Sequence, residues 1–138
     1  MLGNRAIIAT ECLYRIALGR GKPVPCREIC DAVGYTVSSL ERAFLVPLKQ
    51  RGFIRAVHGR IGGYLLTRHP AQISLGEVDI AFSEEDTAVN LPETPPVREV
   101  WDLLRQVTHN RLKQYTIATI LTWEKVEEEI KGENDDPS

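Results

Sequence analysis

The chain has 138 residues, of which 43% are hydrophobic and 26% are charged, so it is long and apolar enough for one domain with a core and a small appendage. No apolar run approaches the roughly 20 residues that cross a bilayer, and the N-terminus lacks the pattern of a secretory signal. We therefore expect a cytoplasmic protein with no membrane-spanning segment.

The charges are divided unevenly along the chain. Residues 1–70 contain 11 Lys and Arg against 4 Asp and Glu, a net charge of +7, whereas residues 71–138 contain 6 against 15, a net charge of −9. This asymmetry is typical of a protein in which one face meets a polyanion such as nucleic acid. The alternative is ordinary local variation in charge.

The first two predicted helices precede a short turn. Apolar residues at helical spacing indicate a helix over residues 4–18. A second helix is expected over residues 26–33, and Gly34 is a suitable C-terminal cap for it.

A third helix follows and runs toward Arg51. Thr36 or Ser38 can cap its start, and Ser38 together with Glu41 fits a capping box. Pro47 lies inside this helix, where it removes one hydrogen bond and predicts a kink or an early end.

A basic hairpin is predicted directly after the third helix. Two β-prone runs, residues 53–57 and 64–67, flank a glycine-rich turn. The cationic side chains on its tip and arms are Arg55, His58, Arg60 and Arg68. Such a ribbon can reach into a groove of nucleic acid and meet phosphates. The order helix, turn, helix and basic hairpin is that of a winged helix.

The second half of the chain is predicted to be helical and acidic. Ser74 and Glu77 form a capping box that opens a short helix to about Phe82, and a final helix is expected over residues 117–131. The chain thus divides into a winged helix-turn-helix DNA-binding domain (1–82), an acidic linker (83–94), dimerisation helices (95–131) and a disordered acidic tail (132–138).

A long amphipathic helix is expected from Thr94, which is followed by two prolines, to about Lys113. Its apolar stripe consists of Val97, Val100, Trp101, Leu104 and Val107. We expect Val97, Trp101, Leu104 and Val107 to form a dimer interface with the same helix of a second copy. The alternative is that this stripe packs onto its own domain.

Several short motifs resemble the IscR–NsrR–CymR family of bacterial winged-helix transcription regulators over about residues 5–122. They are Leu40-Glu41, Gly52-Phe-Ile, Val57-His-Gly, Gly62-Gly-Tyr-Leu-Leu and Ile73-Ser-Leu-Gly-Glu-Val78. The resemblance implies a mainly α fold with a small β-hairpin, a winged helix-turn-helix followed by a long C-terminal dimerisation helix.

The resemblance also implies how DNA would be bound. The third helix would enter the major groove and the hairpin the adjacent minor groove, and Ser38 and Glu41 match family residues that touch base edges. The DNA-binding residues expected in this chain are Ser38, Ser39, Glu41, Arg42, Arg55, His58 and Arg60.

The sequence departs from the family pattern at three places. His58 stands where the family usually has the wing arginine, so Arg60 is expected to take over that role. The third helix is one residue longer than is common. Many members hold an iron–sulfur cluster through three cysteines just before the long helix, but residues 83–113 contain no cysteine. We therefore expect no iron–sulfur cluster, no other cofactor and no metal site. The alternative is a cluster held in an unusual arrangement by the three cysteines of the chain together with Glu11 or His109.

The three cysteines, Cys12, Cys26 and Cys30, are expected on the first two helices as small buried side chains. Cys26 is a possible redox sensor, because a helix N-terminus favours the thiolate.

These observations predict a homodimeric, sequence-specific regulator that occupies a palindromic operator in double-stranded DNA, as a repressor does. No Ser–His–Asp set, carboxylate pair or phosphate loop is visible, so we do not expect an enzyme. The alternatives are a winged-helix adaptor that has lost DNA binding and a thiol- or ligand-responsive sensor.

Overall fold

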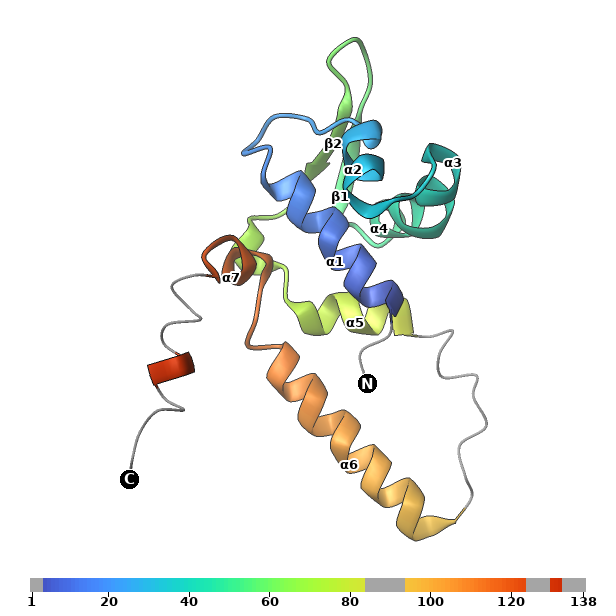
Figure 1. Cartoon of the computed structure of the whole chain (residues 1–138), viewed down its shortest axis with the longest axis vertical. Helices are drawn as coiled ribbons and strands as arrows, with labels where there is room; N and C mark the ends of the chain where they lie inside the picture. Colours follow the sequence, from blue (N-terminus) through green and yellow to red (C-terminus); the bar gives the residue numbers. More distant parts are fainter. Residues whose placement is uncertain (1–3, 84–93, 124–129, 133–138) are drawn as a thin grey trace.

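The computed structural model describes residues 4–83, 94–123 and 130–132. Its N-terminal part is a helical unit with one hairpin, and a long helix extends away from that unit (Figure 1). Of the predicted linker (83–94) only Ser83 and Thr94 belong to the described residues, and of the predicted tail (132–138) only Gly132. The remaining residues of both segments lie outside the described residues. Among the described residues, no helix is both long and apolar enough to cross a bilayer.

The first two helices lie where the sequence predicts them. They are α1 (Asn4–Ala17) and α2 (Cys26–Val33). Gly34 ends α2 in the left-handed region, with a φ of 77°, and its N–H donates to the Cys30 carbonyl oxygen at 2.8 Å. A glycine takes this conformation without the steric penalty that a Cβ would bring.

The third helix consists of three consecutive segments, α3 (Val37–Leu40), a π-helical turn η1 (Glu41–Leu45) and α4 (Val46–Gln50). Thr36 caps it by accepting a hydrogen bond from the Ser39 N–H at 3.3 Å. The capping box predicted for Ser38 and Glu41 is therefore wrong, because the helix begins one residue before Ser38. Of the kink or early end predicted at Pro47, the early end is wrong, because the helix continues through Pro47 to Gln50. A π turn over Glu41–Leu45 precedes this last segment.

The predicted hairpin is also present, as β1 (Ile54–Val57) and β2 (Gly63–Leu66). Ile54 lies opposite Leu66 and Val57 opposite Gly63 in an antiparallel pair. Val24 adds one bridge to β2, in which the Val24 and Tyr64 N–H groups each donate to the other residue's carbonyl oxygen at 3.0 and 2.9 Å. The base of the hairpin is thereby tied to the segment that leads into α2.

A 3₁₀ turn η2 (Pro70–Gln72) and helix α5 (Leu75–Ser83) follow the hairpin. The predicted capping box of α5 is confirmed, because the Glu77 N–H donates to Ser74 Oγ at 3.1 Å and the Ser74 N–H donates to Glu77 Oε2 at 3.3 Å.

The C-terminal helices are α6 (Pro95–Leu112) and α7 (Ile117–Leu121). The segment between them pairs with the start of α5, since the Leu75 N–H donates to the Tyr115 carbonyl oxygen at 2.9 Å and the Ile117 N–H to the Ile73 carbonyl oxygen at 3.0 Å. The prediction of one unbroken helix over residues 117–131 is wrong, because the chain leaves the helical conformation at Thr122, where φ is −116° and ψ is 27°.

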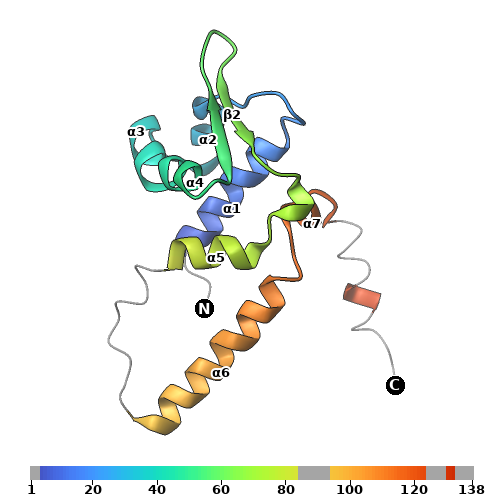
Figure 2. The same ribbon diagram turned by 180° about the vertical axis from the view of Figure 1, so that it is seen from behind.

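The core lies among α1, the third helix, β1 and α5. Its largest fully buried side chains are Phe44, Leu13, Ile29, Leu40, Leu45, Leu48, Ile54, Ile73, Ile117, Val78 and Cys12. In contrast, no side chain of α6 is buried, and this helix points away from the hairpin in both views (Figures 1 and 2).

Candidate nucleic-acid interface

The third helix presents a polar face next to its N-terminus. Ser38, Ser39 and Arg42 are exposed, as a base-reading surface requires. Glu41 is half-buried, and its carboxylate lies close enough to Tyr64 to raise the pKa of that phenol, although burial of Tyr64 is the larger cause. Glu41 therefore lies on the side of the helix that faces the hairpin.

The hairpin is exposed and basic at its tip and along β1. His58 and Arg60 at the tip and Arg55 on β1 are all exposed, and the turn is closed by the Gly62 N–H, which donates to the Gly59 carbonyl oxygen at 3.1 Å. Ile61 stands at the same tip with 84% of its surface exposed. The sequence interpretation missed Ile61, because an isolated isoleucine in a loop gives no signal until its exposure is known.

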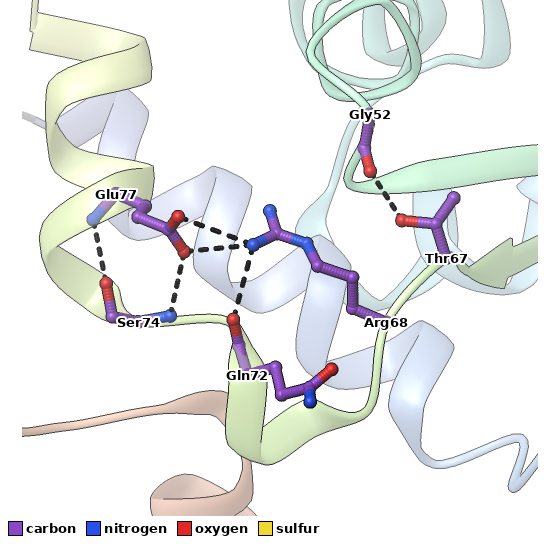
Figure 3. Close-up of polar contacts among 6 residues, drawn as sticks. All are labelled: Gly52, Thr67, Arg68, Gln72, Ser74 and Glu77. Atoms are coloured by element: carbon purple, nitrogen blue, oxygen red, sulfur yellow. Dashed lines mark hydrogen bonds and ion pairs between the residues drawn. The ribbon is translucent and has the colours of Figure 1, made fainter.

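Arg68 has a different role from the other hairpin cations (Figure 3). Its guanidinium donates to the Gln72 carbonyl oxygen at 3.3 Å and to the Glu77 carboxylate at 3.2 Å, and it lies 4.9 Å from the centre of the Phe53 ring. Arg68 thus links the end of β2 to the first turn of α5 and is not part of the exposed basic tip.

The hairpin base is further held by the third helix. The Phe53 N–H donates to the Leu48 carbonyl oxygen at 2.9 Å, and the Thr67 hydroxyl donates to the Gly52 carbonyl oxygen, as Figure 3 shows. The two predicted DNA-contacting elements are therefore joined directly, in the half of the molecule opposite α6 (Figures 1 and 2).

The cysteines gather between α1 and α2. The sulfur atoms of Cys26 and Cys30 are 3.7 Å apart, Cys12 and Cys30 are buried, and Cys26 is half-buried. Burial, followed by the contact with Cys30, raises the pKa of the Cys26 thiol to about 12. This direction is opposite to the one expected from the helix N-terminus, so the environment disfavours a reactive thiolate.

The described residues do not provide a metal centre. They include no group of three or more His, Cys, Asp or Glu side chains that could hold a metal ion. Cysteine-ligated iron–sulfur clusters need about four such ligands, and the residues just before α6 contain no cysteine. Within the described residues, therefore, no four-ligand site of that kind is present.

A pocket of about 500 Å³ is lined by residues of α1, α2, α5, α7 and the C-terminal end of α6. Its lining is mainly apolar and includes Ile7, Leu75, Leu112 and Ile120, with Thr10 and Glu11 among its polar groups. Neither tryptophan lines it.

The sequence profile described as "Rrf2: Iron-dependent Transcriptional regulator" matches residues 2–122. The chain belongs to the Rrf2 family. Protein rrf2 of Nitratidesulfovibrio vulgaris is 28% identical over 130 residues, which cover 87% of this chain and 86% of that protein. The transcriptional regulator IscR of Cronobacter sakazakii is 40% identical over 84 residues, which cover 60% of this chain and 51% of IscR.

Solved structures of this family share the fold. CymR, the global cysteine regulator of B. subtilis, superimposes with a TM-score of 0.75 at 21% identity, covering 89% of this chain and 97% of CymR. T. potens IscR superimposes with a TM-score of 0.74 at 21% identity, covering 88% of this chain and 86% of IscR. The family resemblance and the winged-helix fold predicted from the sequence are confirmed, and the chain is a transcriptional regulator of the Rrf2 type.

Proposed function

We propose that this Rrf2-family protein is a homodimer that binds a palindromic operator sequence-specifically and holds no iron–sulfur cluster. The observation that carries the proposal is the joining of an exposed polar helix face to an exposed basic hairpin tip at one end of the molecule, opposite the helix that would join two copies.

Each surface has a separate task in this proposal. Ser38, Ser39, Glu41 and Arg42 on the third helix read base edges in the major groove, where the half-buried Glu41 accepts from a cytosine amino group. Arg55, His58 and Arg60 neutralise phosphates and probe the minor groove.

The dimer is proposed because α6 carries exposed apolar side chains. Val97, Trp101, Leu104 and Val107 are 38–57% exposed, and they repeat at helical spacing along one face. An apolar stripe of this length that stays this exposed is typical of an interaction surface. Two copies joined through α6 would hold two reading units at once, as an operator with two half-sites requires.

The test is a titration of fluorescent duplex DNA at several salt concentrations. If each subunit places three or four cations on phosphates, a dimer makes roughly 6–8 contacts, so the slope of log affinity against log salt should be about −5 to −7. We expect Arg60→Ala to weaken binding to all duplexes and to flatten this slope by about 2, because each dimer loses two contacts. Arg98→Ala on the distant helix α6 is the control for the loss of charge and should leave the slope unchanged.

Other outcomes would support other functions. An unmutated protein without affinity for any duplex at low salt would point to the adaptor. An affinity that changes on oxidation by diamide, and not in Cys26→Ser, would point to a thiol sensor. The observation that supports a ligand-responsive sensor is the pocket lined by α1 and α5. In that case the affinity for DNA would depend on a small molecule bound in this pocket.

A further inference from the structure

A proline interrupts the hydrogen bonding of the third helix at the place where the helix would meet DNA. Pro47 has no N–H, so the Ala43 carbonyl oxygen, four residues earlier, lacks its usual helical donor. The turn before it is π-helical, and the Val46 N–H donates to the Glu41 carbonyl oxygen, five residues back. This wider turn takes up one extra residue, and Glu41 and Arg42 both belong to it.

The missing donor is supplied from another helix. Arg5 of α1 donates from Nη2 to the Ala43 carbonyl oxygen at 2.9 Å, across 38 positions in the sequence. Because this bond is partly buried, the carbonyl would otherwise lose its water without gaining a partner, which is costly.

The same guanidinium also contacts two aromatic rings. It lies 5.6 Å from the centre of the Phe44 ring in the π turn and 5.5 Å from the centre of the Phe82 ring in α5, and both rings are buried. The two rings are themselves 5.9 Å apart. One side chain therefore connects α1, the π turn and the last turn of α5.

We propose that Arg5 is a positioning residue for DNA recognition. It stabilises the π turn that precedes Pro47 and so fixes the direction in which Glu41 and Arg42 face the major groove. This inference rests on the proposed function. Arg5 itself touches no DNA in this arrangement, because its guanidinium is directed toward the Ala43 carbonyl oxygen and the two buried rings.

The experiment is a double-mutant cycle with Arg5→Met and Pro47→Ala. The probes are a duplex selected from a random pool by the unmutated protein and a duplex of scrambled sequence. We expect Arg5→Met to lower the ratio of the two affinities at least about tenfold while leaving the salt slope nearly unchanged. In the Pro47→Ala background the alanine N–H can bond to the Ala43 carbonyl oxygen, so there Arg5→Met should change the ratio less than about threefold.

Two further variants separate positioning from charge and from stability. Arg15→Met removes one positive charge from the same helix, where Arg15 pairs with Glu11, and should leave the ratio within about twofold. Arg5→Lys keeps the charge but replaces the planar fork, so it should lower the ratio to an intermediate value even if Arg5→Met fails to fold.

In one outcome the unmutated protein discriminates between the two duplexes, while Arg5→Lys and Arg5→Met leave the ratio of the two affinities unchanged. That result would overturn this inference and leave the proposed function standing. An equal loss in both backgrounds would also overturn it, because Arg5 would then act independently of Pro47. An unmutated protein without affinity for either duplex would overturn the proposed function itself.

Discussion

At the scale of single residues, the thiols show how burial controls chemistry. Burial is the largest cause that raises the pKa of Cys12 to about 12, and the nearby Glu11 carboxylate adds to it. The pKa of Cys26 is raised to about 12 as well, and burial is again the largest cause. Because the thiolate is the reactive form, both groups should react slowly with thiol reagents while the protein is folded.

The raised thiol pKa values make stability depend on alkaline pH. Near pH 7, well below the ordinary thiol pKa of 9.0, the thiols are protonated in both states, so they contribute no pH dependence there. Between pH 9 and about 12 the unfolded chain loses these protons while the folded chain keeps them, so the free energy of unfolding should fall as the pH rises.

Urea unfolding at pH 7, 9 and 10.5 tests this dependence. The fall in the free energy of unfolding should be smaller in Cys12→Ala than in the unmutated protein, whatever the absolute stability of the variant. Tyrosine and lysine titrations are common to both proteins and cancel in the comparison. An equal fall in the two proteins would mean that Cys12 ionises as readily in the folded state as in the unfolded chain.

The position of Gly63 requires glycine, both because the backbone of Val24 lies close to it and because its φ is positive. Its φ is +156°, and a Cβ at this position would lie 2.4 Å from the carbonyl carbon and oxygen of Val24. We expect Gly63→Ala to break the bridge to Val24 and to lower the free energy of unfolding by at least about 2 kcal/mol. Gly21→Ala is the matched control, because φ is +87° there but the space is open, and it should cost about 1 kcal/mol. Equal costs in urea unfolding would show that the contact with Val24 is unimportant.

At the scale of the elements, two helix starts look alike in sequence but differ in structure. Ser74 accepts a hydrogen bond at the start of α5, whereas the Thr94 side chain makes no capping hydrogen bond at the start of α6. Ser74→Ala should therefore lower the free energy of unfolding by about 1 kcal/mol, and Thr94→Ala by less than about 0.5 kcal/mol. Urea unfolding of the two variants measures both values, and a reversed order would contradict these helix starts.

At the scale of the whole molecule, α6 is the helix that we propose joins two copies. Trp101 is 38% exposed, and no side chain of α6 is buried within the chain. Trp101→Ala should therefore leave the unit formed by α1–α5 and the hairpin folded, while truncation of a large interface aromatic costs about 3–5 kcal/mol of association.

Sedimentation equilibrium measures this association directly. We expect the unmutated protein to be a dimer at micromolar concentration and Trp101→Ala to dissociate at least about 100-fold more readily. Gln106→Ala, on the polar face of α6 where Gln106 bonds to Asn110, is the control and should remain a dimer. A monomeric unmutated protein would exclude α6 as a dimerisation helix at this concentration.

The sequence by itself determined the elements whose signals are local. Helical spacing located α1, Gly34 ended α2, and two β-prone runs around a glycine-rich turn located the hairpin, because backbone propensities and caps act within a few residues. The same local signals identified the Ser74 capping box and the exposed hairpin residues Arg55 and Arg60.

Only the tertiary structure decided features that depend on distant partners. The Ala43 carbonyl oxygen in the π turn accepts a hydrogen bond from Arg5, 38 positions away. Arg68 is held away from the exposed tip by its contacts with Glu77 and Phe53. Burial and the contact with Cys30 reversed the direction expected for the Cys26 pKa. Each of these outcomes depends on the side chains around a group and on how much water reaches it. Both are set by the folded structure, because many of the neighbours of a group are distant from it in the sequence.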